Sequence, residues 1–135
     1  MNKRRLIALA LGLAAICGAA PSAFGAPKWL RCPLTEYSGN GGDAPFSPIA
    51  PNVRIVVFDD SPAGFFEYLN GQLQPGNRIE IDSGRIVGHV GIDHFHINRL
   101  TGQVMVYRGV GGKLAGIYRG SCQPTTPMTV RAPKF

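Results

Sequence analysis

The sequence predicts a small all-β domain, and three observations support this prediction. The 135-residue chain contains 18 Gly and 11 Pro, which separate short segments rich in Val, Ile, Phe and Tyr. Several of these segments alternate apolar and polar residues with the period of two that a half-buried strand requires. After residue 25, no stretch keeps a helical period for three turns. Turn signals recur about every 8–12 residues, which is typical of an antiparallel meander.

Two segments of the expected sheet are less regular than the rest. Segment 38–52 is rich in Gly, Pro and Asn and is interpreted as a long loop, whereas 64–69 suits either a strand or one short helical turn. Such a sheet must close or stack to protect its edges, so we expect a small antiparallel barrel-like meander or a sandwich with about seven or eight short strands. The clearest expected strands cover 28–37, 53–58, 78–81, 85–90, 93–99, 103–108 and 113–120.

Residues 1–25 have the pattern of a secretory signal peptide. Three basic residues at 3–5 precede an apolar run at 6–20, and the small residues Ala23 and Gly25 mark a cleavage site. The apolar run is shorter than the roughly 20 residues needed to span a bilayer. We therefore expect a periplasmic or secreted protein with no transmembrane anchor in its mature chain.

Two cysteines remain after this cleavage, Cys32 and Cys122, near the two ends of the mature domain. In an oxidising compartment such a pair predicts a disulfide, and closing a loop of 90 residues stabilises by up to about 4–5 kcal/mol. The alternative is a pair of reactive or metal-binding thiols, although no Cys-x-x-Cys is present. Cys17 would carry a lipid in a lipoprotein, but bulky Ile16 stands where a small residue is expected.

The expected domain organisation is simple. A signal peptide at 1–25 precedes a single β-domain at 26–122, and the proline-rich segment 123–135 forms an irregular C-terminal tail. Half of the formal charge of +6 belongs to the three basic residues at 3–5. The remaining basic residues are scattered among Asp and Glu rather than clustered, which argues against a nucleic-acid partner.

The three histidines of the chain, His89, His94 and His96, lie within eight positions of one another. His94 and His96 share one face of the expected strand, where two imidazoles could chelate Zn²⁺ or Cu²⁺. His89 is out of phase with both and joins them only through a bulge or the fold of the hairpin. The alternative interpretation is a polar outer face, with Phe95 and Ile97 buried behind it.

Motifs for other chemistry are weak. No Gly-x-Ser-x-Gly occurs, and Ser61, Ser83 and Ser121 are each explained by neighbouring turn residues. Segment 109–113 lacks the frame of a phosphate-binding loop and is interpreted as a hairpin turn. Asp59-Asp60 is interpreted as a turn before Pro62 rather than a carboxylate pair. The sequence therefore favours a non-enzymatic protein with no required cofactor.

The segment Asn98-Arg99-Leu100-Thr101-Gly102, followed by the ending Gly120-Ser121-Cys122, resembles a pattern found in small exported bacterial β-domain proteins. The resemblance implies the fold and the location. In physical terms, Gly102 permits a positive φ, Asn98 or Thr101 can bond nearby backbone, and Arg99 can brace the corner.

A second resemblance is to periplasmic lysozyme inhibitors, which are small disulfide-bearing β-barrels with a Ser-Gly-x-x-Tyr-like loop. Ser83-Gly84-Arg85 begins in the same way but lacks the Tyr. We therefore expect an exported, non-enzymatic binding or accessory protein, whose partner is a protein or a small molecule. The alternatives are a divalent-metal protein using His94 and His96, and an inhibitor of a cell-wall hydrolase.

Overall fold

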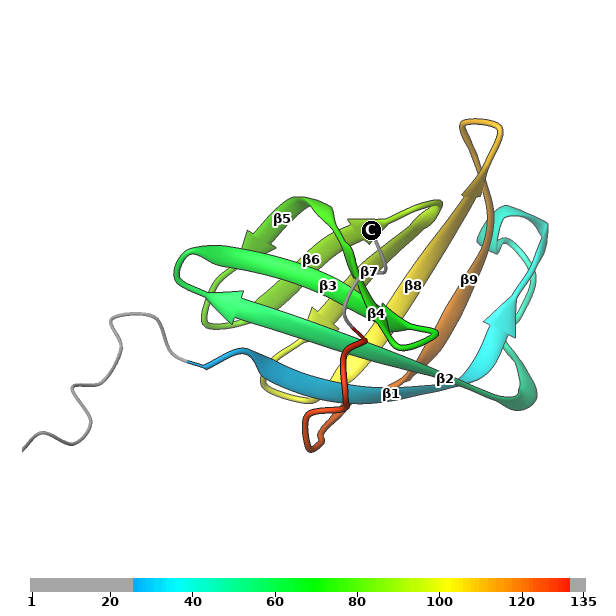
Figure 1. The fold of residues 1–135 in the computed structure, drawn as a ribbon. Helices are drawn as coiled ribbons and strands as arrows, with labels where there is room; N and C mark the ends of the chain where they lie inside the picture. Colours follow the sequence, from blue (N-terminus) through cyan, green and yellow to red (C-terminus); the bar gives the residue numbers. More distant parts are fainter. Residues whose placement is uncertain (1–25, 132–135) are drawn as a thin grey trace, which may run out of the picture.

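The computed structural model describes residues 26–131 and is all-β, with antiparallel strands throughout this range (Figure 1). The predicted signal peptide at 1–25 and Cys17 lie outside the described residues, as do residues 132–135 of the tail. No helix of the described part is long and apolar enough to cross a bilayer.

Ten strands and one short 3₁₀ turn, η1 (Asn40–Gly42), make up the fold. The strands are β1 (Lys28–Ser38), β2 (Ser47–Asp60), β3 (Ala63–Leu69), β4 (Gln72–Pro75), β5 (Asn77–Ile81), β6 (Arg85–Val90), β7 (Asp93–Asn98), β8 (Gln103–Val110), β9 (Lys113–Ser121) and β10 (Gln123–Pro124).

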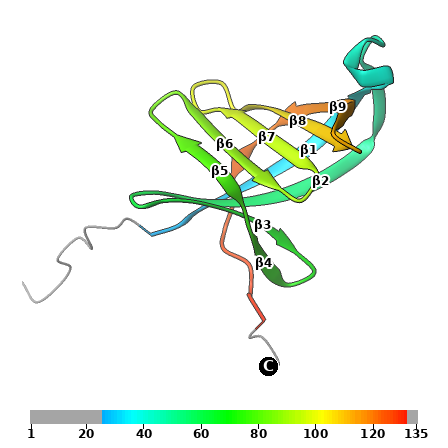
Figure 2. The ribbon, with the colours of Figure 1, turned by 90° about the horizontal axis from the view of Figure 1, so that it is seen from above.

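The sheet is a meander that curls into a nearly closed barrel. Its order is β4-β3-β2-β1-β9-β8-β7-β6-β5, so the first strand pairs with β9, and β10 also pairs with β1. The edge strands β4 and β5 are consecutive in the chain, and between them the Gly76 N–H donates to the Phe65 carbonyl at 2.7 Å. Figure 2, seen from above, shows β3 and β4 crossing beside β5. The predicted barrel-like all-β fold is thus confirmed.

Close packing of β3 on β6 draws the two edges together. Phe65 is 1% exposed, and its ring lies on the backbone of Gly88. A Cβ built at Gly88 would stand 2.3 Å from the ring, so only glycine allows this contact. The Phe65 ring also lies 5.5 Å from that of Phe95 on β7.

The structure differs from the expectation in strand number and in the segment 38–52. Segment 64–69 is a strand, β4 and β10 are additional short strands, and β2 already begins at Ser47. Pro48 and Pro51 made the start of β2 resemble a loop. Because β3 pairs with β2 only from Ile55 onward, residues 47–52 have β1 as their single neighbour, and proline is tolerated at such an edge.

The tail keeps hydrogen bonds to the sheet beyond Cys122. The Thr125 N–H donates to the Trp29 carbonyl at 2.9 Å, and the Tyr68 hydroxyl donates to the Thr129 carbonyl at 2.7 Å. The Arg131 N–H donates to the Gly71 carbonyl at 2.8 Å. Residues 125–131 are irregular in backbone but lie along β1, β3 and the β3–β4 turn.

Candidate functional site

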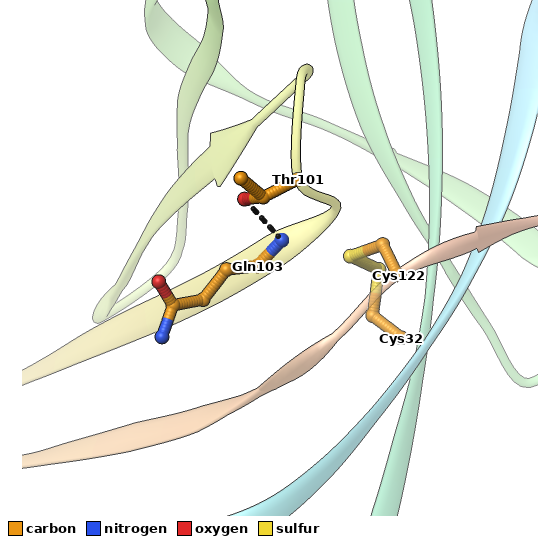
Figure 3. Close-up of a disulfide and its surroundings, with 4 residues drawn as sticks. All are labelled: Cys32, Thr101, Gln103 and Cys122. Atoms are coloured by element: carbon orange, nitrogen blue, oxygen red, sulfur yellow. Dashed lines mark hydrogen bonds between the residues drawn. A yellow bond between two sulfur atoms is a disulfide. The ribbon is translucent and has the colours of Figure 1, made fainter.

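The predicted disulfide is present and joins the first strand to the end of β9. Cys32 and Cys122 are both buried, with an S–S distance of 2.06 Å and a Cα–Cα distance of 4.0 Å. Figure 3 shows the bond directly beside the β7–β8 turn. We call this region, formed by Leu30, Phe58, Ile86, Ile97 and Cys122, the disulfide end of the barrel.

The β7–β8 turn at this end is fixed by its own polar side chains. The Asn98 Oδ1 accepts from the N–H of Leu100 at 2.9 Å and of Thr101 at 3.1 Å. The Thr101 hydroxyl accepts from the Gln103 N–H at 3.2 Å (Figure 3). Short polar side chains that accept backbone N–H groups in this way stabilise turns.

Gly102 closes the turn against the cysteine. Its φ is 77°, in the left-handed region, and its carbonyl accepts from the Cys122 N–H at 2.7 Å. A Cβ at Gly102 would stand 2.8 Å from the Cys122 carbonyl oxygen. Both the backbone angle and the close approach therefore require glycine.

Arg99 connects this turn to two other turns. Its guanidinium donates to the Asp60 carboxylate at 2.5 Å and to the Asp82 carbonyl at 2.8 Å, while Lys28 forms a second ion pair with Asp60. Hydrogen bonds from Arg99 and then Lys28 hold the pKa of Asp60 below its ordinary 3.8. Both cations also lie over the Phe58 ring, at 5.2 Å for Arg99 and 5.5 Å for Lys28.

A cavity of about 330 Å³ opens between this turn and the start of β1. Its floor consists of the apolar side chains of the disulfide end, and its rim is the 98–102 turn with Pro124. Leu100 stands at the rim and is 84% exposed, the most exposed large apolar side chain of the described residues. The cavity therefore combines an apolar floor with a rim that carries polar side chains, which is the usual construction of a ligand pocket.

The opposite end of the interior is charged. Arg54, Glu67, Asp93 and Arg108 point inward there, and we call these four residues the charged end. Arg54 binds Glu67 through two hydrogen bonds and reaches Asp93 at 2.9 Å. Arg108 donates to both oxygens of Asp93 at 2.9 Å each.

Solvent is largely excluded from this network. The side chains of Glu67 and Asp93 are each 5% exposed, that of Arg54 12% and that of Arg108 34%. Burial alone would raise the pKa of Asp93, but the hydrogen bonds from Arg108 and Arg54 hold it below 3.8. The hydrogen bonds that Arg108 donates to Asp93 raise the pKa of Arg108 above its ordinary value. Asp93, Arg54 and Arg108 are therefore charged at neutral pH.

The sequence contains a sign of the charged end that the motifs considered above do not include. Arg54 is in phase with the inward Val56 and Phe58, and Asp93 is in phase with Phe95 and Ile97. A charged residue in step with the apolar positions of a strand must point into the core, where it needs a partner.

In the structure, the fold of the β6–β7 hairpin brings His89 next to His94. His94 and His96 share the outer face of β7, as their spacing requires, but His89 is directly opposite His94 across the β6–β7 hairpin. The rings of His89 and His94 lie against each other, whereas the centroid of the His96 ring lies 5.1 Å from that of Tyr107. Within residues 26–131, no group of three or more His, Cys, Asp or Glu is arranged to hold a metal.

The Ser83-Gly84-Arg85 segment and the Asp59-Asp60 pair have local structural roles. In the Ser83-Gly84-Arg85 segment, the N–H groups of Gly84 and Arg85 donate to the Asp82 carboxylate at 2.8 and 2.9 Å. Asp59 and Asp60 end β2, with Asp60 in the ion pairs described above.

Comparison with known proteins adds no relative. No family model matches the chain, and neither a curated protein nor a solved structure is detectably similar to it.

Proposed function

We propose that the protein is an exported, non-enzymatic binding domain that holds a small amphipathic molecule in the cavity at the disulfide end. Export rests on the pattern of residues 1–25. Binding rests on one observation: Leu100, 84% exposed on a turn fixed by hydrogen bonds, lines a cavity together with the buried side chains of Phe58, Ile86 and Ile97.

The shape of the cavity indicates the kind of ligand. Leu30, Phe58, Ile86 and Ile97 offer contacts only to an aliphatic chain or a ring, whereas the rim carries the polar side chains of Asn98 and Thr101. The turn uses these two side chains as acceptors, so the Asn98 amide group and the Thr101 hydroxyl can still donate to a ligand. A volume of about 330 Å³ is at the lower limit for ligand pockets, so the ligand has one short apolar body with one polar head. Side chains of both charges surround the rim. The test therefore includes a negatively charged, a neutral and a positively charged head group.

The test compares three probes that share one chain: octanoate, octanol and octyltrimethylammonium. Each is titrated into the exported ¹⁵N-labelled protein, and amide shifts are followed by NMR. We expect saturable shifts at Leu100, Thr101 and Cys122 and none at Gly111. Leu100→Asp should weaken binding about fivefold or more, because it removes apolar contact at the rim.

The matched control is Val110→Asp, since Val110 is 60% exposed on the distant β8–β9 hairpin. This variant should bind like the wild type. Absence of saturable shifts with all three probes, or equal weakening by both variants, would contradict the proposed site.

A further inference from the structure

The outer face of the β6–β7 hairpin carries a pair of imidazoles that the cavity does not involve. Val90 pairs with Asp93, so only Gly91 and Ile92 form the loop, and this register places His89 opposite His94. Both side chains are partly exposed, and their rings lie against each other.

Two imidazoles on directly opposite positions of a hairpin have the composition of a metal-binding pair. Imidazole nitrogens suit Zn²⁺, Cu²⁺ and Ni²⁺, and among divalent ions of the first row Cu²⁺ binds such ligands most tightly. The neighbouring strand β5 places one charge of each sign near His89, those of Arg78 and Glu80. Because the two charges oppose each other, β5 does not strongly repel a metal cation. Partly exposed side chains change rotamer rapidly, which allows each ring to turn one nitrogen toward a common ion.

We propose that His89 and His94 form a two-histidine Cu²⁺ site on this hairpin, with solvent completing the coordination. His96 lies outside the site, because its ring packs against Tyr107 on β8. The site is independent of the cavity, so either proposal can fail without the other. It also differs from a site of His94 and His96, which strand spacing alone would favour.

The experiment is a Cu²⁺ titration of the exported protein, followed by calorimetry and by electron paramagnetic resonance. We expect one saturable Cu²⁺ whose spectrum shows nitrogen coupling and which EDTA removes. His89→Ala and His94→Ala should each weaken binding at least about tenfold, since even the loss of an outer partner of a metal ligand costs about 10–100-fold.

Two variants serve as controls. His96→Ala keeps the pair and should bind Cu²⁺ within about twofold of the wild type. The double variant His89→Ala/His94→Ala lacks the pair but keeps the amino terminus. Copper bound by this variant is therefore subtracted from the copper bound by the wild type. Weakening by His96→Ala equal to that by His94→Ala would overturn the assignment in favour of the strand pair. A wild-type titration no different from that of the double variant would overturn the site itself.

Discussion

The two ends of the barrel interior are built from different chemistry. At the disulfide end, inward side chains are apolar and the covalent bond ties β1 to the end of β9. At the charged end, two arginines and two carboxylates fill the corresponding space and satisfy one another. The disulfide end is stabilised by apolar packing and by the disulfide, which lowers the conformational entropy of the unfolded chain. The charged end is stable only while every buried charge keeps its partner.

This difference predicts that the ends respond differently to substitution. The largest effect is expected for Asp93→Ala, which leaves Arg54 buried beside only one carboxylate. Breaking a buried ion pair in this way costs about 3–5 kcal/mol of unfolding free energy. Urea denaturation of the purified protein measures this loss of unfolding free energy. Asp43→Ala, an exposed control, should stay within about 0.5 kcal/mol of the wild type.

The disulfide end should lose somewhat less when its covalent bond is removed. Replacing Cys32 and Cys122 together by Ser should cost about 2–4 kcal/mol, because the unfolded chain regains the freedom of a 90-residue loop. The same denaturation curves give the value. Thiol reagents should leave the native wild type unmodified until it is reduced; free titration of both thiols would contradict the account.

A smaller effect is expected at the turn beside the disulfide. Gly102→Ala combines an unfavourable positive φ with a contact on the Cys122 carbonyl, whereas Gly111→Ala meets only the unfavourable φ, because open space surrounds it. We expect the first variant to be less stable than the second by about 1 kcal/mol or more. Equal melting temperatures would show that the turn yields to the added Cβ.

The sequence predicted the disulfide end better than the charged end, for a physical reason. Cysteine pairing and turn residues are local or rare signals, so Cys32, Cys122 and the strands between turns could be identified one segment at a time. The ion pairs join residues that are 13 to 39 positions apart. Knowing that Arg54 meets Asp93 requires the barrel to be closed first.

The histidine pair also depends on how two strands are placed side by side, but over a much shorter stretch of chain. The spacing of His94 and His96 places both on one face but does not say which neighbouring strand approaches them. A two-residue loop at Gly91-Ile92 sets the register that brings His89 opposite His94. Two-residue hairpin loops are recognisable from glycine, so this pair could have been derived from the sequence.

The most direct measurement of the difference between the ends is residue-level hydrogen exchange of the metal-free protein at decreasing pH. Because the folded pKa of Asp93 lies below its unfolded value of about 3.8, its ion pairs stabilise fully above that pH and are lost as the pH falls through the folded pKa. Asp60 and Asp82 also have lowered pKa values, but they are exposed and contribute less.

We therefore expect amides near Arg54, Glu67 and Asp93 to lose protection at a higher pH than those of Cys122 and Val104, which lie beside the β7–β8 turn. Loss of protection at both ends together, or first at the disulfide end, would contradict the division of the interior proposed above.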